Sequence, residues 1–123
     1  MMRLLCFLVC VAALAGAAHA QQSPAAPEPA LLQPLAQGPF TADMVAAGKA
    51  QFHRTCSHCH GSNMVNSGTT VYDLRKFPVD QPDRFLNSVT NGKGNMPSFK
   101  GALEREAIQL LWSYVATRGG KEM

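Results

Sequence analysis

Two cysteines and a histidine at fixed spacing are the residues of this chain best suited to chemistry. Cys56-Ser57-His58-Cys59-His60 is a C-x-x-C-H sequence, the pattern through which c-type haem is attached. Two intervening residues let both thiols reach the vinyl groups on neighbouring pyrroles of one haem. His60 then lies beneath the iron, where its imidazole can serve as the proximal ligand. The motif therefore predicts one covalent haem c, held by Cys56 and Cys59, with His60 on its iron.

Other interpretations of the cysteine pair need different surroundings. A redox-active dithiol without haem also uses C-x-x-C, but it belongs to a strand–helix context that this sequence does not predict. A zinc site could combine the two cysteines with His58 or His60, but it would need further ligands, and the nearest other histidine is His53. A disulfide between Cys56 and Cys59 would close a tiny loop and would stabilise little.

The second axial ligand decides between electron transfer and the binding of small molecules. Met44 lies on a helix face that should pack, Met64 follows His60 too closely, and Met123 lies at the end of the chain. Met96 lies in a loop with two glycines, and Pro97 fixes the backbone beside it. A lone methionine is usually core filler, but in this context we expect Met96 to ligate the iron.

The elements that must position these ligands read as helices. Thr41 is suited to cap a helix that runs to about residue 54, and its apolar residues recur at helical spacing. A second helix is predicted from Pro82 to about residue 91, and a last one over residues 103–117. Residues 61–70 are rich in Gly, Ser and Asn and read as a loop. No run alternates like a strand, so we expect an all-α fold of three to four helices.

The chain divides into four segments. Residues 1–20 have the charged start, apolar run and small-residue end of a secretory signal peptide. That run is short for a bilayer, so we expect a periplasmic protein without stable membrane insertion. Residues 21–39 are rich in Pro and Ala and read as a disordered leader. Residues 40–118 form one domain, and 119–123 a flexible tail.

Charge and size exclude some functions and support others. The formal net charge is +3, without a dense Lys/Arg stripe and interleaved aromatic residues, so we expect no nucleic-acid partner. A small domain of short helices has a thin core and commonly needs a cofactor. A buried haem would supply the missing apolar volume.

With these features the sequence resembles the class I mono-haem cytochromes c. The shared features are Gly48 and Phe52, the C-x-x-C-H motif, Met96-Pro97, Trp112 and Tyr114. The finer pattern is similar to the soluble cytochromes c that accept electrons from quinoprotein (PQQ) alcohol dehydrogenases, over residues 59–68, 72–75, 90–97 and 111–115. The resemblance implies a small cytochrome c fold in which the first and last helices cross, with Gly48 against an aromatic residue.

The resemblance also implies a function. It predicts a monomeric, periplasmic one-electron carrier with His60 and Met96 as axial ligands, not an enzyme, although it could be the cytochrome subunit of an oxidoreductase. Its partners would be redox proteins: a dehydrogenase as donor and an oxidase or another cytochrome as acceptor. The alternative is a five-coordinate haem protein that binds a small gas or acts as a peroxidase. Arg75 could neutralise a haem propionate or simply be exposed, and Trp112 could lie near a propionate or in the core.

One departure from the family concerns the proximal histidine. Many class I cytochromes have a proline soon after it, whose carbonyl accepts the second imidazole N–H. This chain has no proline between His60 and Pro78. A ligating histidine needs its second nitrogen oriented, so another carbonyl within residues 61–71 is expected to accept it.

Overall fold

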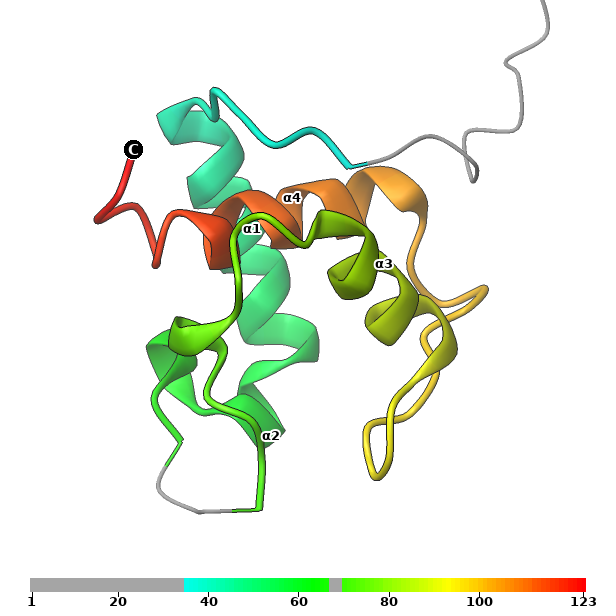
Figure 1. Cartoon of the computed structure of the whole chain (residues 1–123). Helices are drawn as coiled ribbons and strands as arrows, with labels where there is room; N and C mark the ends of the chain where they lie inside the picture. The colour runs from blue at the N-terminus through cyan, green and yellow to red at the C-terminus, as the bar shows by residue number, and fades with distance from the viewer. Residues whose placement is uncertain (1–34, 67–69) are drawn as a thin grey trace, which may run out of the picture.

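The chain folds into short helices connected by long loops. The computed structural model describes residues 35–66 and 70–123, so the predicted signal peptide and most of the leader lie outside the described residues. The α-helices are α1 (Ala42–Thr55), α2 (Ser57–His60), α3 (Pro82–Asn91) and α4 (Arg105–Ala116), with 3-10 turns η2 (Ser62–Met64) and η3 (Leu74–Lys76) (Figure 1). The all-α prediction is confirmed: the described residues contain isolated β-bridges but no strand.

The first predicted helix is confirmed with its cap. The Thr41 hydroxyl oxygen accepts a hydrogen bond from Met44 N at 3.2 Å, which satisfies one of the free N–H groups of the first turn. Asp43 lies in that turn, where the helix dipole favours an acid. The buried side of α1 consists of Val45, Gly48 and Phe52.

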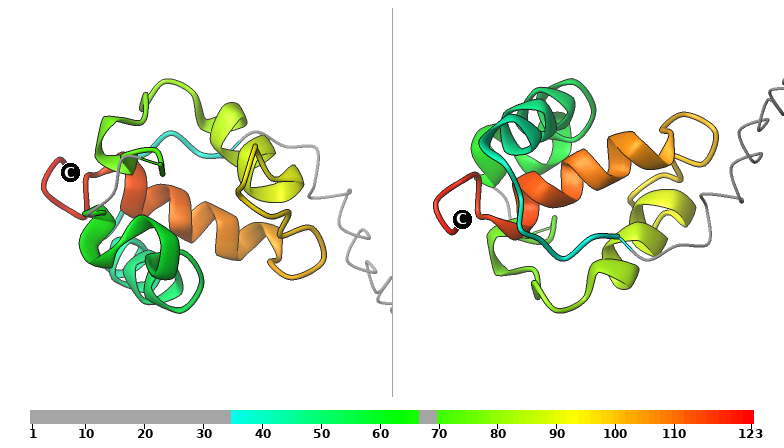
Figure 2. Two further views of the ribbon diagram at one scale, coloured as in Figure 1. Left: turned by 90° about the horizontal axis from the view of Figure 1, so that it is seen from below. Right: turned by 90° about the horizontal axis from the view of Figure 1, so that it is seen from above.

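The crossing of α1 and α4 organises the core. Figure 2 shows α4 running between α1 on one side and the segment that contains α3 on the other. A Cβ atom at Gly48 would overlap the Leu110 carbonyl group and lie 3.0 Å from Tyr114 Cβ. The absent side chain therefore allows the two helices to touch, and the expected meeting of Gly48 with an aromatic residue is confirmed.

Helix α4 begins two residues later than predicted and is buried on most of its circumference. Its buried residues are Ile108, Leu111, Trp112, Ser113, Tyr114 and Val115. Phe52 of α1 packs on Tyr114 with ring centroids 5.3 Å apart, and Phe85 of α3 packs on Trp112 at 5.2 Å. Through these two aromatic contacts, α1 packs on α4 at Tyr114 and α3 packs on α4 at Trp112.

The end of the Pro-rich leader packs on α4. Leu35 is only 2% exposed. The side-chain oxygen of Gln109 accepts a hydrogen bond from Ala36 N at 2.8 Å, and its amide donates to the Ala36 carbonyl at 3.4 Å. The packed unit thus includes Leu35 and Ala36, which belong to the predicted leader. In the part of the chain described, no helix combines the length and apolarity that a membrane span requires.

Candidate haem site

The C-x-x-C-H motif follows the end of α1 and folds into one further short helical turn. The N–H of Cys56 donates to Phe52 O and ends α1, and the Cys56 carbonyl then accepts from Cys59 N at 3.2 Å and His60 N at 2.9 Å. The turn closed by these two hydrogen bonds is the short helix α2. It puts Cys56 and His60 on the wall of one cavity, whereas Cys59 is exposed on the same short helix.

That cavity lies between helices that the sequence keeps far apart. Its walls come from α1, α2, the η3 region, α3, the loop after α3 and α4. The lining residues are Phe52, Cys56, His60, Leu74, Phe77, Phe85, Ser88, Val89, Met96, Leu111 and Val115. Its free volume is about 50 Å³, so the walls stand close together. A flat haem macrocycle would have to push these walls apart. Its faces would then make the apolar contacts that the walls now make with each other.

His60 has one ring nitrogen engaged. Its Nδ1 lies 3.3 Å from the Tyr72 carbonyl oxygen, and because a carbonyl only accepts, Nδ1 donates. The acceptor is one residue beyond the range expected from the sequence. Burial lowers the pKa of His60 below its ordinary value, although the bond to Tyr72 acts in the opposite direction. A neutral imidazole with Nδ1 protonated presents Nε2 as its metal-binding atom.

The two cysteines differ in their surroundings. Burial, and then the neighbouring Cys59, raise the pKa of the Cys56 thiol to about 11. Both side chains are free thiols rather than a disulfide. Cys56 thus offers a half-buried attachment point on the cavity wall, and Cys59 offers an exposed one a helical turn later, outside the lining.

Met96 lies on the cavity wall in a loop that the end of α3 holds in place. Lys93 and Met96 exchange two backbone hydrogen bonds of 3.1 and 3.0 Å. The last carbonyls of a helix lack intrahelical partners, and here Val89 O accepts from Phe99 N while Thr90 O accepts from Lys100 N. The Ser98 hydroxyl also donates to Thr90 O, at 2.6 Å. Met96 therefore stands on a loop anchored at both ends.

The loop that carries Met96 requires a glycine at residue 92. Gly92 ends α3 with φ +77°, and a Cβ there would lie 2.6 Å from Met96 O. A residue with a side chain would strain the backbone and push Met96 away.

The other methionines are placed differently. Met64 is buried in the core near Tyr114 and Gly119. Met44 is half-buried on α1, and Met123 is exposed at the chain end. Among the methionines of the described residues, Met96 alone lines the cavity with His60.

Arg75 and Trp112 do not line the cavity. The Arg75 guanidinium donates two hydrogen bonds of 2.8 Å to the Asp73 carboxylate, and it would have to leave that partner to meet a propionate. Trp112 is fully buried, and its Nε1–H finds no acceptor among the described residues. Its ring packs on Phe77 and Phe85, which themselves line the cavity.

The residues present fit a covalent haem. The lining is apolar and contains the Cys56 thiol, the imidazole of His60 and the thioether of Met96, while the second thiol, of Cys59, is exposed one helical turn after Cys56. The buried indole N–H of Trp112 leaves a donor for which a propionate has the right chemistry. For the zinc alternative, no group of three or more His, Cys, Asp or Glu side chains able to hold a metal occurs in residues 35–66 and 70–123.

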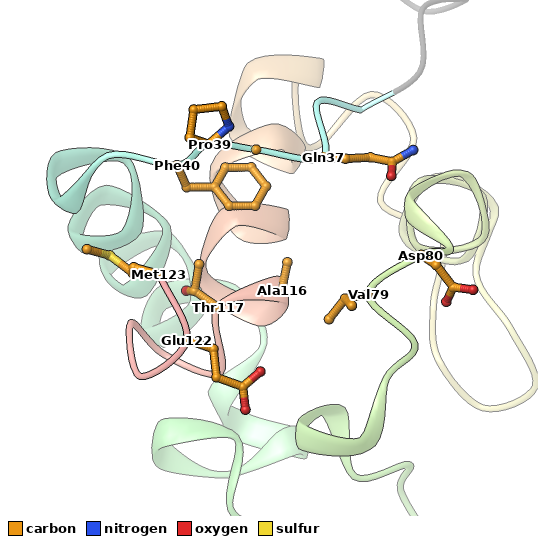
Figure 3. Close-up of a pocket in the computed structure, with 10 residues that line it drawn as sticks. Gln37, Pro39, Phe40, Val79, Asp80, Ala116, Thr117, Glu122 and Met123 are labelled. Atoms are coloured by element: carbon orange, nitrogen blue, oxygen red, sulfur yellow. The ribbon is translucent and has the colours of Figure 1, made fainter.

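A larger hollow of about 450 Å³ lies elsewhere (Figure 3). It is bounded by residues 37–40, by Val79 and Asp80, and by the C-terminal end of α4 with Glu122 and Met123. None of its lining residues lines the haem cavity, and it contains no cysteine or histidine. The candidate haem ligands His60 and Met96 thus line the smaller cavity and not this hollow.

Comparison with known families agrees with this site. The family model described as cytochrome c oxidase, cbb3-type, subunit III matches residues 43–115, which include the C-x-x-C-H motif and Met96. The chain therefore belongs to this family of cytochrome c domains. It carries a covalent haem c and is an electron-transfer protein rather than an enzyme.

Individual relatives agree with the family. Cytochrome c6 of Microcystis aeruginosa is 36% identical over 78 residues, which cover 60% of this chain and 96% of that protein. Cytochrome c6 of Nostoc sp. is 38% identical over 80 residues, 62% of this chain and 71% of that protein. The quinohemoprotein alcohol dehydrogenase ADH IIB of Pseudomonas putida is 36% identical over 104 residues, 80% of this chain but 15% of that enzyme. No solved structure matches the chain.

Proposed function

We propose that the chain is a periplasmic one-electron carrier whose single haem c is attached to Cys56 and Cys59 and ligated by His60 and Met96. The observation that carries this proposal is the presence of His60 and Met96 in the lining of one apolar cavity. When bound, haem supplies an Fe(II)/Fe(III) couple, and a His/Met ligand pair gives it a high potential.

The protein's own residues would hold the haem iron and shield it from solvent. The Tyr72 carbonyl fixes the ring of His60, and the anchored loop holds Met96. Phe52, Leu111 and Val115 close the cavity from α1 and α4. If His60 and Met96 both ligated the iron of a bound haem, no position would be open to a substrate, which favours a carrier over a gas-binding protein or a peroxidase.

Replacing the sixth ligand tests this assignment. Met96→Ala should lower the reduction potential and allow carbon monoxide to bind the ferrous protein. Met64→Leu is the matched control, because it changes another buried methionine close to the motif and conserves volume, which cores tolerate. Rapid, tight binding of carbon monoxide by the wild-type ferrous protein would instead support the five-coordinate alternative.

The donor that we propose is a periplasmic dehydrogenase of the quinoprotein alcohol dehydrogenase class. The support is the alignment of most of this chain with a segment of a quinohemoprotein alcohol dehydrogenase. Rapid mixing of a reduced quinoprotein alcohol dehydrogenase with the oxidised cytochrome should give fast haem reduction. A rate no higher than that with an unrelated reduced flavoprotein dehydrogenase would count against this donor.

The charge around Met96 indicates the chemistry of the docking partner. The loop from 92 to 100 exposes Lys93 and Lys100 and contains no acidic residue. We expect the partner to present acidic groups, so that the association rate falls with ionic strength. Lys93→Gln should slow haem reduction at low salt, whereas Lys121→Gln, an exposed lysine in the tail, should not.

A further inference from the structure

The hydrogen bond that orients His60 depends on a loop rather than on a helix. The acceptor is the Tyr72 carbonyl, 3.3 Å from Nδ1. Tyr72 precedes η3 and belongs to no regular element. Whatever fixes the backbone on either side of Tyr72 therefore fixes the direction of that carbonyl.

Side chains hold this backbone on both sides. After Tyr72, the Asp73 carboxylate accepts from Arg75 N at 3.0 Å and caps η3. Before it, the half-buried Asn66 amide donates to the Val71 carbonyl at 3.0 Å. Val71 O and Tyr72 O are successive carbonyls of one chain segment, so a bond that fixes the first limits the rotation of the second.

We propose that Asn66 is a positioning residue for His60: its bond to Val71 holds the Tyr72 carbonyl toward the imidazole Nδ1–H. A carbonyl that accepts from a ligating histidine raises the basicity of the ligand. A more basic ligand stabilises Fe(III) over Fe(II) and lowers the reduction potential. Asn66 thus tunes the potential without lining the cavity, by holding the Tyr72 carbonyl that takes the place of the proline carbonyl in many class I cytochromes.

This role rests on the proposed function, because it requires His60 to ligate the iron. The test uses the haem-loaded protein. Asn66→Leu keeps a similar shape without the amide, and Asn66→Ala removes the side chain, so that one informative variant remains if the other fails to fold. Val65→Ala is the matched control, since Val65 is the exposed neighbour in the same loop.

Two measurements distinguish a positioning role of Asn66 from a general loosening of the loop. Both Asn66 variants should raise the reduction potential, shifting the electron-exchange equilibrium with wild type at least threefold, or about 30 mV. In the ferrous proteins, the His60 Nδ1–H followed by NMR should exchange with solvent at least tenfold faster than in wild type. Val65→Ala should change neither quantity.

The outcomes distinguish this inference from the proposal beneath it. If the wild-type protein shows a low-spin, histidine-ligated spectrum and both Asn66 variants keep its potential and its proton exchange rate, the role of Asn66 is wrong and the carrier function stands. If the wild-type spectrum shows no histidine ligation, the proposed function fails and the role of Asn66 fails with it. A shift in Val65→Ala as large as in Asn66→Leu would also overturn the positioning role.

Discussion

Gly48 of α1 lies against the backbone carbonyl group of Leu110 on α4, and a side-chain carbon at residue 48 would overlap that group. Gly48→Ala should therefore destabilise the protein. Overpacking typically costs about 1–3 kcal/mol, and we expect the upper end here because the overlap is with backbone atoms. The better helix propensity of alanine returns about 1 kcal/mol. We expect a net loss of about 2 kcal/mol in the free energy of unfolding by denaturant.

The exposed Ala47 of the same helix provides the control for this change. Ala47→Ser should alter the free energy of unfolding by no more than about 0.5 kcal/mol. An unchanged or higher stability of Gly48→Ala would mean that α1 and α4 do not approach each other at this point.

Ser98→Ala should loosen the loop that carries Met96. The Ser98 hydroxyl donates to the carbonyl of Thr90 at 2.6 Å, and such a bond contributes about 1 kcal/mol. Exogenous imidazole can bind ferric iron only if the loop releases Met96, so its apparent affinity should rise about fivefold in Ser98→Ala. A spectrophotometric imidazole titration measures this, with exposed Ser62→Ala as the control. Equal affinities in the three proteins would show that the Ser98 bond does not restrain Met96.

The Asp73–Arg75 pair should set the acid behaviour of the loop beside His60. Hydrogen bonds from the Arg75 side chain lower the pKa of Asp73 from its ordinary value of 3.8 to about 2. Because the folded-state pKa lies below that of the unfolded chain, the ionised carboxylate contributes stability above pH 4, and this contribution is lost as the pH falls toward 2. An NMR titration of the Asp73 carboxyl in the ferrous protein should therefore show a midpoint near pH 2.

Arg75→Ala should return that midpoint toward the ordinary value. If the midpoint is already near 4 in the wild-type protein, the Arg75 side chain does not bind Asp73 in solution. Arg75 would then be available to a haem propionate, as one of the two sequence-based interpretations has it.

Helices α1 and α3 were predictable because each carries its own local signals. Thr41 and Asp43 mark the start of α1, Pro82 starts α3, and a glycine after Asn91 ends it. The choice of Met96 over Met64 also rested on local context. The structure places Met96 in the cavity lining and Met64 in the core.

The features that the sequence did not predict lie in loops, and their backbone path has no simple sequence signal. The turns η2 and η3 are too short to have a periodicity, and η3 depends on the Asp73 cap. The Tyr72 carbonyl is a backbone group, which no residue type marks. Leu35 follows a Pro-rich stretch that reads as a linker, and only its burial and the hydrogen bond of the next residue, Ala36, to Gln109 show that it belongs to the packed unit.

Coordination of the iron by both His60 and Met96 is the central claim, and proton NMR of the reduced, diamagnetic holoprotein tests it most directly. A methionine bound to haem iron lies in the ring current, so its ε-methyl group should give a three-proton resonance far upfield of all other signals. The account predicts this resonance in the wild type and in Met64→Leu, and its loss in Met96→Ala. A wild-type spectrum without an upfield methionine methyl signal, or one in which that signal persists in Met96→Ala, would contradict the account.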